Sequence, residues 1–317
     1  MTLSVLRTLD DVGCSRWWLR TPRGAAAIAT DAATTGELLA DRSAIEAAAR
    51  SADRVPLDSL DLVSPVTAPC RVVAQMTNYR SHVRDSGMDP DSVPLTFFRK
   101  TSGSISGPYD DVLRPGHVRF LDYEVEIGIV FARSIPVGTA VTGDNLADYV
   151  AGLVVTNDVS ARDLQLPKTQ FFEAKSYPSF TPVGPELVLL DADELRRFAE
   201  LRLTLAVNGT TRQDALVQGD MVFGPLEAVQ ALTQFQRLDA GDLLLTGTPV
   251  GTALSAPPRL VGLIGGLLPA RVRWAAFFKR QAGNPKYLQD GDVIEARVAT
   301  DDGTIDLGRQ RTTVRCA

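Results

Sequence analysis

The sequence has few cysteines, and they form no recognisable pattern. Only Cys14, Cys70 and Cys316 occur among 317 residues. Their number is odd, and their spacing fits neither a disulfide framework nor a zinc or redox motif. We therefore expect reduced thiols and a cytoplasmic location.

The chain also lacks an excess of positive charge. Lys and Arg number 33 against 38 Asp and Glu, which gives a formal net charge of -5. Surfaces that bind nucleic acids in general are usually basic. We expect no nucleic-acid partner.

Long apolar runs are absent as well. None approaches the roughly 20 residues that a membrane-spanning helix needs. Near the start, Arg7, Asp10 and Asp11 interrupt the apolar stretch that a signal peptide would require. We expect neither a signal peptide nor a membrane partner.

What remains is the composition of a globular protein, with 44% hydrophobic and 22% charged residues. The length allows a large core and two unequal units. The Pro- and Ser-containing segment Ser64–Pro69 is typical of a linker. We expect a small β-rich unit over residues 1–69 and a main unit over 70–317, with an α+β fold that is mainly β.

The first unit shows short alternating patterns around turns. The expected strands are Ser4–Leu9, Arg16–Arg20 and Ala25–Ala29. Thr35 is placed to cap a helix that runs to about Ala52.

In the main unit, acidic and apolar residues alternate over Asp122–Gly128, which predicts a strand. Because a strand has a period of two, Asp122, Glu124 and Glu126 should share one face. Three neighbouring carboxylates repel one another and resist ionising together. A positive group should therefore face them, although the alternation alone is equally compatible with a solvated acidic surface.

A second strand brings a further acid. The apolar segment Tyr149–Asn157 predicts a buried strand, and Asp158 follows at its carboxyl end. The all-oxygen set of Glu124, Glu126 and Asp158 suits a hard divalent cation, Mg²⁺ first, with Mn²⁺ or Ca²⁺ as alternatives. Three carboxylates leave room for water and for a chelating substrate.

Only two histidines occur in the chain. A helical turn within residues 78–88 would put His82 and Asp85 on one face. A carboxylate beside an imidazole fixes its tautomer and raises its basicity, as a general base requires. On spacing alone, a surface ion pair is the better interpretation. The other histidine, His117, lies in a turn and predicts no site.

Other polar residues lie where chain segments end. Ser160 could cap a helical turn that puts Arg162 and Gln165 on one face, both directed to the metal. An irregular loop over Gln170–Thr181 carries Lys175.

Another strand ends in a loop rich in glycine and threonine, within Gly241–Gly251. The loop lacks the lysine of a P-loop. Its amides and the Thr248 hydroxyl could still bind a carboxylate.

Taken together, these segments resemble the fumarylacetoacetate hydrolase family over about residues 70 to 312. The matching segments, in this order, are Asn78-Tyr79 with His82, Asp122–Glu126, Asn157–Gln165, Lys175-Ser176, Thr246–Pro249 and Gly291–Val293. The resemblance implies a mixed β-sandwich roll, a homodimer and a Mg²⁺ site. It also implies metal-dependent cleavage of C–C bonds beside a carbonyl, or closely related chemistry.

The resemblance also implies roles for single residues. The metal ligands would be Glu124, Glu126 and Asp158. The residues facing the substrate would be Lys175, Arg162, Gln165 and Thr248, the last binding its carboxylate. His82, with Asp85 three residues later, would be the base that activates water, which replaces the ion-pair interpretation of this pair.

Residues 255–285 form a longer insert than compact family members have. Trp274, Phe277 and Phe278 lie near helical spacing among basic residues. Such a helix can lie on a membrane surface. We expect it instead to cover a core, a dimer interface or the mouth of the site.

These features predict a Mg²⁺-dependent hydrolase that cleaves a C–C bond in a β-diketone or acylpyruvate-like acid. His82, oriented by Asp85, would take a proton from water, and the metal and Lys175 would stabilise the resulting enolate. The alternative is a decarboxylase or a tautomerase or isomerase acting on a β-keto acid at the same site. A non-catalytic binding protein is a third possibility, but mere binding would require neither His82 nor Lys175.

Overall fold

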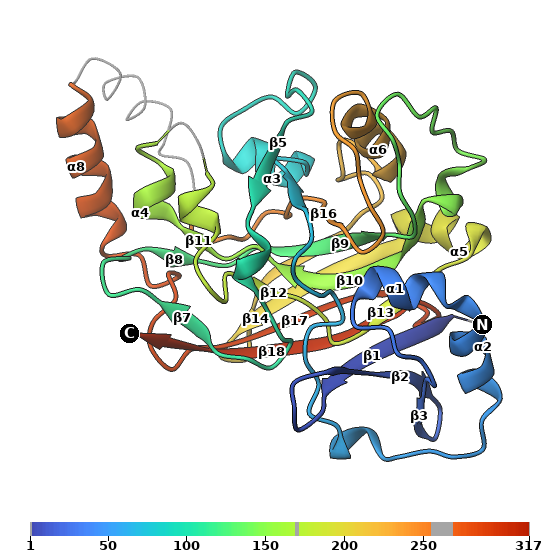
Figure 1. The fold of residues 1–317 in the computed structure, drawn as a ribbon. Helices are drawn as coiled ribbons and strands as arrows, with labels where there is room; N and C mark the ends of the chain where they lie inside the picture. Colours follow the sequence, from blue (N-terminus) through green and yellow to red (C-terminus); the bar gives the residue numbers. More distant parts are fainter. Residues whose placement is uncertain (1, 169–170, 255–268, 317) are drawn as a thin grey trace.

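The computed structural model describes residues 2–168, 171–254 and 269–316, and its regular structure is mainly β (Figure 1). The strands of the first unit are β1 (Leu3–Leu9), β2 (Ser15–Thr21) and β3 (Gly24–Ala27). Its helices are α1 (Thr35–Ala40) and α2 (Arg42–Arg50).

The main unit alternates longer strands with short helices. Its strands are β4 (Val72–Gln75), β5 (Phe97–Lys100), β6 (Ile105–Ser106), β7 (Val112–Arg114), β8 (Leu121–Asp122), β9 (Val125–Phe131), β10 (Val150–Asn157), β11 (Ser160–Ala161), β12 (Thr181–Pro182), β13 (Leu187–Leu189), β14 (Leu201–Val207), β15 (Thr210–Leu216), β16 (Leu243–Leu245), β17 (Val293–Thr300) and β18 (Asp306–Cys316). Its helices are α3 (Arg80–Asp85), α4 (Arg162–Gln165), α5 (Ala192–Arg196), α6 (Pro225–Thr233) and α8 (Ala270–Gln281).

Two sheets pack face to face, which confirms the expected sandwich. The larger sheet has nine strands in the order β3-β2-β1-β13-β10-β9-β16-β4-β5, and the smaller has five in the order β15-β14-β17-β18-β7. Strands β9 and β10 of the first lie against β14, β17 and β18 of the second. Alternate residues of the facing strands, among them Ile127 and Ile129 of β9 and Leu203 and Leu205 of β14, share one buried core, as period-two alternation requires.

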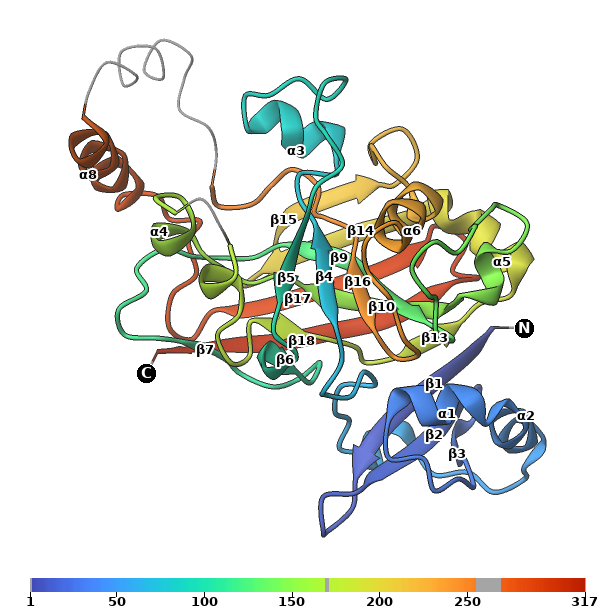
Figure 2. The same ribbon diagram turned by 45° about the horizontal axis from the view of Figure 1, so that its top comes forward.

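The first unit extends the large sheet. Strand β1 pairs antiparallel with β13, with Leu3 opposite Leu189. A second buried cluster crosses the expected boundary at residue 69, because Trp17 and Leu38 belong to it together with Leu187 and Leu243. Figure 2 shows this unit at one edge of the large sheet.

The long helix expected from Thr35 to Ala52 is two helices. Asp41 lies between them with φ -98° and ψ 55°, and its carboxylate accepts from the amide of Ala44 and the hydroxyl of Thr30. A short acidic side chain that bonds nearby backbone competes with helix continuation. The N-cap of α1 is Thr34 and not the expected Thr35, and Thr34 forms a capping box with Glu37.

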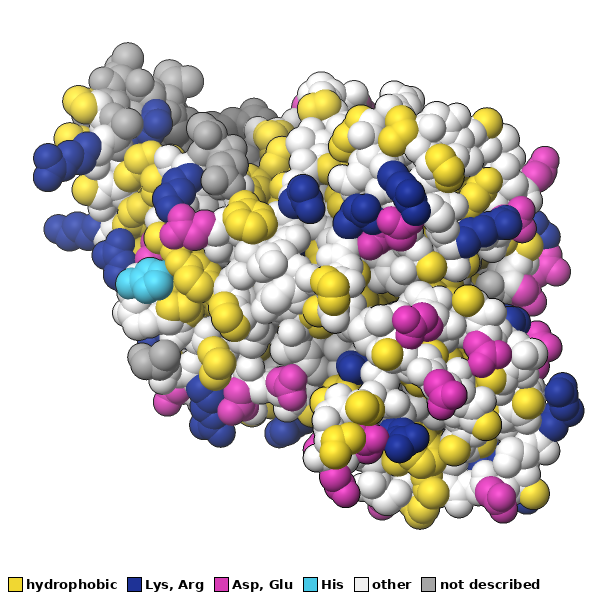
Figure 3. Space-filling view, in the orientation of Figure 1, with side chains coloured by type: hydrophobic (Ala, Val, Ile, Leu, Met, Phe, Trp, Pro, Cys, Tyr) yellow, Lys and Arg dark blue, Asp and Glu magenta, His cyan; other side chains and the backbone are white. Residues whose placement is uncertain are grey.

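Helix α8 confirms the helical spacing of the aromatic residues in the insert. Phe278 stacks on Phe120 with 5.6 Å between ring centroids, and Trp274 stacks on Phe278 at 5.9 Å. The basic residues of α8 are exposed, and Figure 3 shows Lys and Arg side chains on this side of the molecule. Both ribbon views place α8 beside α4. The first half of the insert, residues 255–268, lies outside the described residues.

None of the described helices is long and apolar enough to cross a membrane.

Candidate active site

The acidic segment is broken, so the three acids do not lie on one continuous strand as the alternation predicts, although Arg162 contacts both Asp122 and Glu124. Strand β8 ends at Asp122 and pairs with β11, whereas β9 begins at Val125 and pairs with β10. Between them the backbone amides bind side chains: that of Tyr123 donates to Asp122 Oδ1 at 2.9 Å, and that of Glu124 to Asn157 Oδ1 at 2.9 Å. These bonds to side chains replace the backbone hydrogen bonds between neighbouring strands, so the alternation of a strand ends here.

The other three carboxylates do meet. Each of Glu124, Glu126 and Asp158 offers an oxygen within 4.8 Å of the other two, and all three residues are buried. The register of β9 and β10 explains this, because Thr156 lies opposite Glu126 and the Asp158 amide donates to the Glu124 carbonyl at 2.8 Å. This acidic trio could hold a divalent cation, for which oxygen donors are suited.

Lysines contact the acidic trio from two sides. Lys175 Nζ lies 2.5 Å from Glu124 Oε2 and 2.6 Å from Asp158 Oδ2. Lys100 Nζ donates to Asp158 Oδ1 and, at 3.0 Å, to the carbonyl of Phe180. Lys175 was expected here from the family motif.

Lys100 was not expected. The available signal was its place at the end of β5, where Arg99 is exposed and the next side chain must point the other way, into the core. Sequence alone does not show that Lys100 reaches Asp158, because β9, β16 and β4 lie between β10 and β5 in the large sheet.

Arg162 and Gln165 share one face of α4, as predicted, but they bind protein groups. The Arg162 guanidinium donates from Nε to Asp122 Oδ2 at 2.8 Å, from Nη2 to Glu124 Oε1 at 2.5 Å and from Nη1 to Gln165 Oε1 at 2.7 Å. Ser160 does not cap the helix, because its hydroxyl donates to the Asp158 carbonyl and Ala161 is the N-cap. Arg162 thus cross-links three protein groups, and its expected contact with a substrate stays a prediction.

The charges leave one carboxylate without compensation. Burial raises the pKa of Glu124, but Lys175 and Arg162 outweigh this and bring that pKa to about 2. Burial and then the charges of Asp158 and Glu124 raise the pKa of Glu126 well above its usual range. The cluster thus lacks one positive charge at the oxygens that a cation would bind, so these residues fit a metal ion.

His82 lies on α3 close to this cluster. Burial lowers the pKa of its imidazole, and Arg162 and Lys175 lower it further, although Glu124 acts in the opposite direction. The neutral form is therefore favoured at neutral pH. Its Nδ1 is buried and, among the described residues, has no hydrogen-bond partner. Asp85, the residue expected to orient the imidazole, thus makes no hydrogen bond to Nδ1, and its charge raises that pKa less than the charge of Glu124 does.

The loop after β16 supports the acidic trio from behind. The Gly247 amide donates to Glu126 Oε2 at 2.7 Å. The Thr248 hydroxyl donates to the Val125 carbonyl at 2.9 Å and accepts from Gln213 Nε2 at 2.8 Å. The Thr248 hydroxyl thus has two protein partners, and the expected bond of this loop to a substrate carboxylate stays a prediction.

His117 lies in a turn, as expected, and its Nε2 is 2.8 Å from the hydroxyl of Tyr177. Tyr177 follows Lys175 by two residues, so this contact fastens the loop that carries the lysine.

Replacing Lys100 by methionine should lower the free energy of unfolding by about 2–3 kcal/mol, because it removes one partner of a buried ion pair and leaves Lys175 as partial compensation. Urea denaturation of the metal-free protein measures this. Lys168→Met is the control, since its pair with Glu173 is exposed and should contribute little. Equal, small losses in both variants would contradict a structural role for Lys100.

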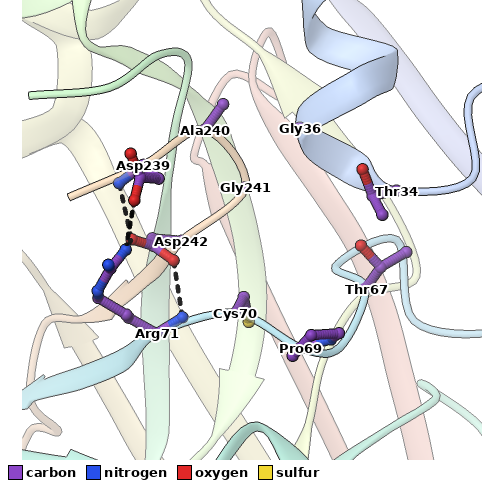
Figure 4. Close-up of a pocket in the computed structure, with 10 residues that line it drawn as sticks. All are labelled: Thr34, Gly36, Thr67, Pro69, Cys70, Arg71, Asp239, Ala240, Gly241 and Asp242. Atoms are coloured by element: carbon purple, nitrogen blue, oxygen red, sulfur yellow. Dashed lines mark hydrogen bonds and ion pairs between the residues drawn. The ribbon is translucent and has the colours of Figure 1, made fainter.

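A pocket of about 380 Å³ lies at the other end of the large sheet, between the first unit and the start of β4 and β16 (Figure 4). Cys70 lines it, and burial followed by the charge of Asp242 raises the pKa of this thiol to about 12. Such a thiol is a poor nucleophile at neutral pH. Asp242 accepts from the Arg71 amide at 2.7 Å and from Arg71 Nη1 at 2.9 Å, so the polar groups here bind one another.

Comparison with known proteins assigns the family. The sequence model described as fumarylacetoacetate (FAA) hydrolase C-terminal matches residues 71–315. The chain belongs to this family. A crystal structure described as a probable 2-hydroxyhepta-2,4-diene-1,7-dioate isomerase from Mycobacterium abscessus superposes on this chain with a TM-score of 0.73 and 30% identity, over 100% of this chain and 99% of that one. This likeness confirms the expected fold.

Curated relatives catalyse several reactions. The 2,4-didehydro-3-deoxy-L-rhamnonate hydrolase of Sphingomonas is 34% identical over 276 residues, 84% of this chain and 82% of that protein. The oxaloacetate tautomerase YisK of Bacillus subtilis is 32% identical over 76% of this chain and 71% of its own length. The mitochondrial oxaloacetate tautomerase Fahd2a of Rattus norvegicus is 33% identical over 205 residues. These residues are 64% of this chain and 63% of the length of that relative. Hydrolases, isomerases and tautomerases thus occur among the relatives of this enzyme family member.

Proposed function

We propose that this protein catalyses enolisation of a small anionic 2-oxo acid, and that keto–enol tautomerisation of oxaloacetate is the reaction to test first. The observation that carries the proposal is the position of His82, an imidazole held neutral by burial beside a buried cluster of opposite charges. A neutral imidazole accepts a proton, and a positively charged neighbourhood favours the enolate that remains.

The names of the relatives support this substrate class. Oxaloacetate is a 2-oxo acid, a 2-hydroxyhepta-2,4-diene-1,7-dioate is an enol of one, and a 2,4-didehydro-3-deoxy sugar acid carries two oxo groups beside a methylene. Tautomerisation and isomerisation of such acids pass through the enol or enolate of the 2-oxo acid, and C–C hydrolysis of a diketo acid releases an enolate. Stabilisation of that enolate is what the three reactions have in common.

We assign a separate role to each residue of the site. Glu124, Glu126 and Asp158 would hold Mg²⁺, with Mn²⁺ or Ca²⁺ as alternatives. When bound, the ion would supply Lewis acidity at the oxo group. His82 would take the proton from the adjacent carbon. Lys175 would stabilise the negative charge on oxygen.

Lys175 suits this role because it stays charged. Burial alone would lower its pKa, but Asp158 and Glu124 outweigh burial and raise that pKa above its ordinary value. We therefore give Lys175 the part of a fixed cation and not that of a base. Gln165, held by Arg162 at 2.7 Å, would orient the substrate from the α4 side.

C–C bond hydrolysis of a β-diketone or acylpyruvate-like acid remains the second candidate. It is favoured by the relative that is named a hydrolase, because the alignment with that protein covers 84% of this chain. In that reaction His82 would take a proton from water, and the same enolate would leave as a product. A decarboxylase or a non-catalytic binding protein has no such support.

The deciding experiment uses the purified full chain with Mg²⁺. Enol oxaloacetate should convert to the keto form well above the buffer rate, followed by ultraviolet absorbance. Exhaustive chelation should abolish the excess rate, and added Mg²⁺ should restore it. Parallel assays with acylpyruvates would detect two cleavage products. Tautomerisation at the buffer rate, with cleavage of an acylpyruvate, would replace the first candidate by the second.

The association and location of the protein belong to the same proposal. We expect a homodimer in the cytoplasm that binds a small anionic keto acid or diketone, without a nucleic-acid or membrane partner. Among the relatives, the oxaloacetate tautomerase of Bacillus subtilis and the mitochondrial one of Rattus norvegicus show that one fold serves different compartments.

A further inference from the structure

We infer that Asp122 and Arg162 form a positioning pair that holds Glu124 in place for metal binding and ties it to the backbone at Ala253 and Leu254. This inference rests on the proposed metal site at the acidic trio. It assigns a role to Asp122, which no step of the proposed reaction uses, and adds a positioning role to the substrate contact expected of Arg162.

Asp122 is fully buried, and its carboxylate is saturated. Oδ1 accepts from the amides of Tyr123 at 2.9 Å and Ala253 at 2.7 Å. Oδ2 accepts from the amide of Leu254 at 3.1 Å and from Arg162 Nε at 2.8 Å. A carboxylate has about four lone-pair sites, and all are used. Asp122 therefore has no free site for a metal or a substrate and can act only through what it holds.

Arg162 transmits the position of Asp122 to the trio. Its guanidinium is a rigid planar fork, so fixing Nε also fixes the directions of Nη1 and Nη2. Nη2 donates to Glu124 Oε1 at 2.5 Å, while Lys175 holds Oε2. The Glu124 carboxylate is thus fixed at both oxygens, and Arg162 determines one of the two contacts. A shift of Asp122 would move Glu124 and Gln165 together.

The same carboxylate fastens the chain beside the insert. The Ala253 carbonyl accepts from Asn284 Nδ2 at 2.8 Å, so the chain just before the insert is joined to the last residues of the insert. Asp122 binds the amides of Ala253 and Leu254 and also binds Arg162, so its side chain links this junction directly to Arg162. The site and the base of the insert therefore share one hydrogen-bonded support.

Two variants test the pair through Mn²⁺ affinity, measured by calorimetry on the metal-free full chain. Asp122→Asn keeps the size but replaces one acceptor by a donor. Arg162→Lys keeps the charge but loses the fork. Each should weaken Mn²⁺ binding about tenfold, the lower end of what residues supporting a metal ligand contribute. The double variant should be no weaker than the weaker single one, because both act through one contact.

Asp242→Asn is the matched control. Asp242 is also buried and also joins an arginine to backbone amides, in the pocket of Figure 4. It lies at the opposite end of β9, since its carbonyl accepts from Phe131, five residues beyond Glu126. The control should lower the thermal unfolding temperature and leave Mn²⁺ affinity within about twofold. A loss of affinity shared by all three variants would mean general destabilisation and would overturn the inference.

A purely electrostatic role for Arg162 predicts different Mn²⁺ affinities. If only the local charge mattered, Arg162→Lys would bind Mn²⁺ like the wild type and Arg162→Met would bind it more tightly. Either result overturns the pair. Should Asp122→Asn fail to fold, Arg162→Lys decides the matter alone. A wild type that binds Mn²⁺ without converting oxaloacetate refutes the proposed reaction and leaves this test intact, whereas a wild type that binds no Mn²⁺ refutes both.

Discussion

Replacing His82 by alanine should lower turnover by about 10²- to 10⁴-fold, the usual contribution of a general base. Affinity for Mg²⁺ or Mn²⁺ should stay nearly unchanged, because the acidic trio lies in or directly before β9 and directly after β10, and not on α3. The fold should survive, since α3 is anchored by other residues: the Ser81 amide donates to Asp220 at 2.7 Å, and Asn78 donates to the Thr246 carbonyl at 2.8 Å.

Steady-state kinetics with oxaloacetate and the pH profile check this together. Burial holds the pKa of His82 below its ordinary 6.5. A base is lost when it is protonated, so activity should fall with decreasing pH only below about 6.5, the unperturbed value. The alanine variant should lose this acid limb. Asp85→Asn should cost much less, because Asp85 makes no hydrogen bond to the buried Nδ1. Wild-type turnover in His82→Ala would mean that another group takes the proton.

Glu126→Gln should weaken Mg²⁺ binding by at least about a hundredfold, more than the loss of a residue that merely supports a ligand. The same change should not destabilise the metal-free protein. Glu126 has its pKa raised by burial and by two neighbouring carboxylates, so its charge opposes folding when no cation balances it. Glutamine keeps the shape and an acceptor for the Gly247 amide.

Calorimetric titration and thermal unfolding without metal measure the two halves of this expectation. Glu186→Gln is the control, because it should change stability and not metal affinity. Glu186 is also buried, but its ion pair is with Arg20 of the first unit and includes no member of the acidic trio. It should lose stability and keep metal affinity. A Glu126→Gln protein with the metal affinity of the wild type would remove Glu126 from the ligand set.

The acidic trio could be predicted because its cause is local. Alternation along one strand identified Glu124 and Glu126, and the end of an apolar strand identified Asp158. The same reasoning failed for Asp122, two residues earlier. Side chains from distant segments, Asn157 among them, take the amides there and end the strand. Periodicity describes a strand only while its backbone bonds follow the ladder.

The surrounding cations show the second limit of sequence reasoning. Lys175 was identified through the family motif, which already contains tertiary information. Lys100 is 58 residues from Asp158 in the chain, and three strands of the large sheet separate β5 from β10, so no local pattern predicts their contact. The Thr248 hydroxyl shows the same limit, because it donates to the carbonyl of Val125, 123 residues away in the chain, and no local pattern predicts this bond.

The pairing of β1 with β13 has a consequence for aggregation. Strand β13 contains Leu187, Val188 and Leu189, and it would be the outermost strand of the main unit if residues 1–69 were removed. An exposed apolar edge strand invites pairing with another chain. The first unit covers this edge and ends the sheet in β3, a short strand of glycine and alanines. We therefore expect residues 71–315, the span that the family model matches, to aggregate more readily than the whole chain.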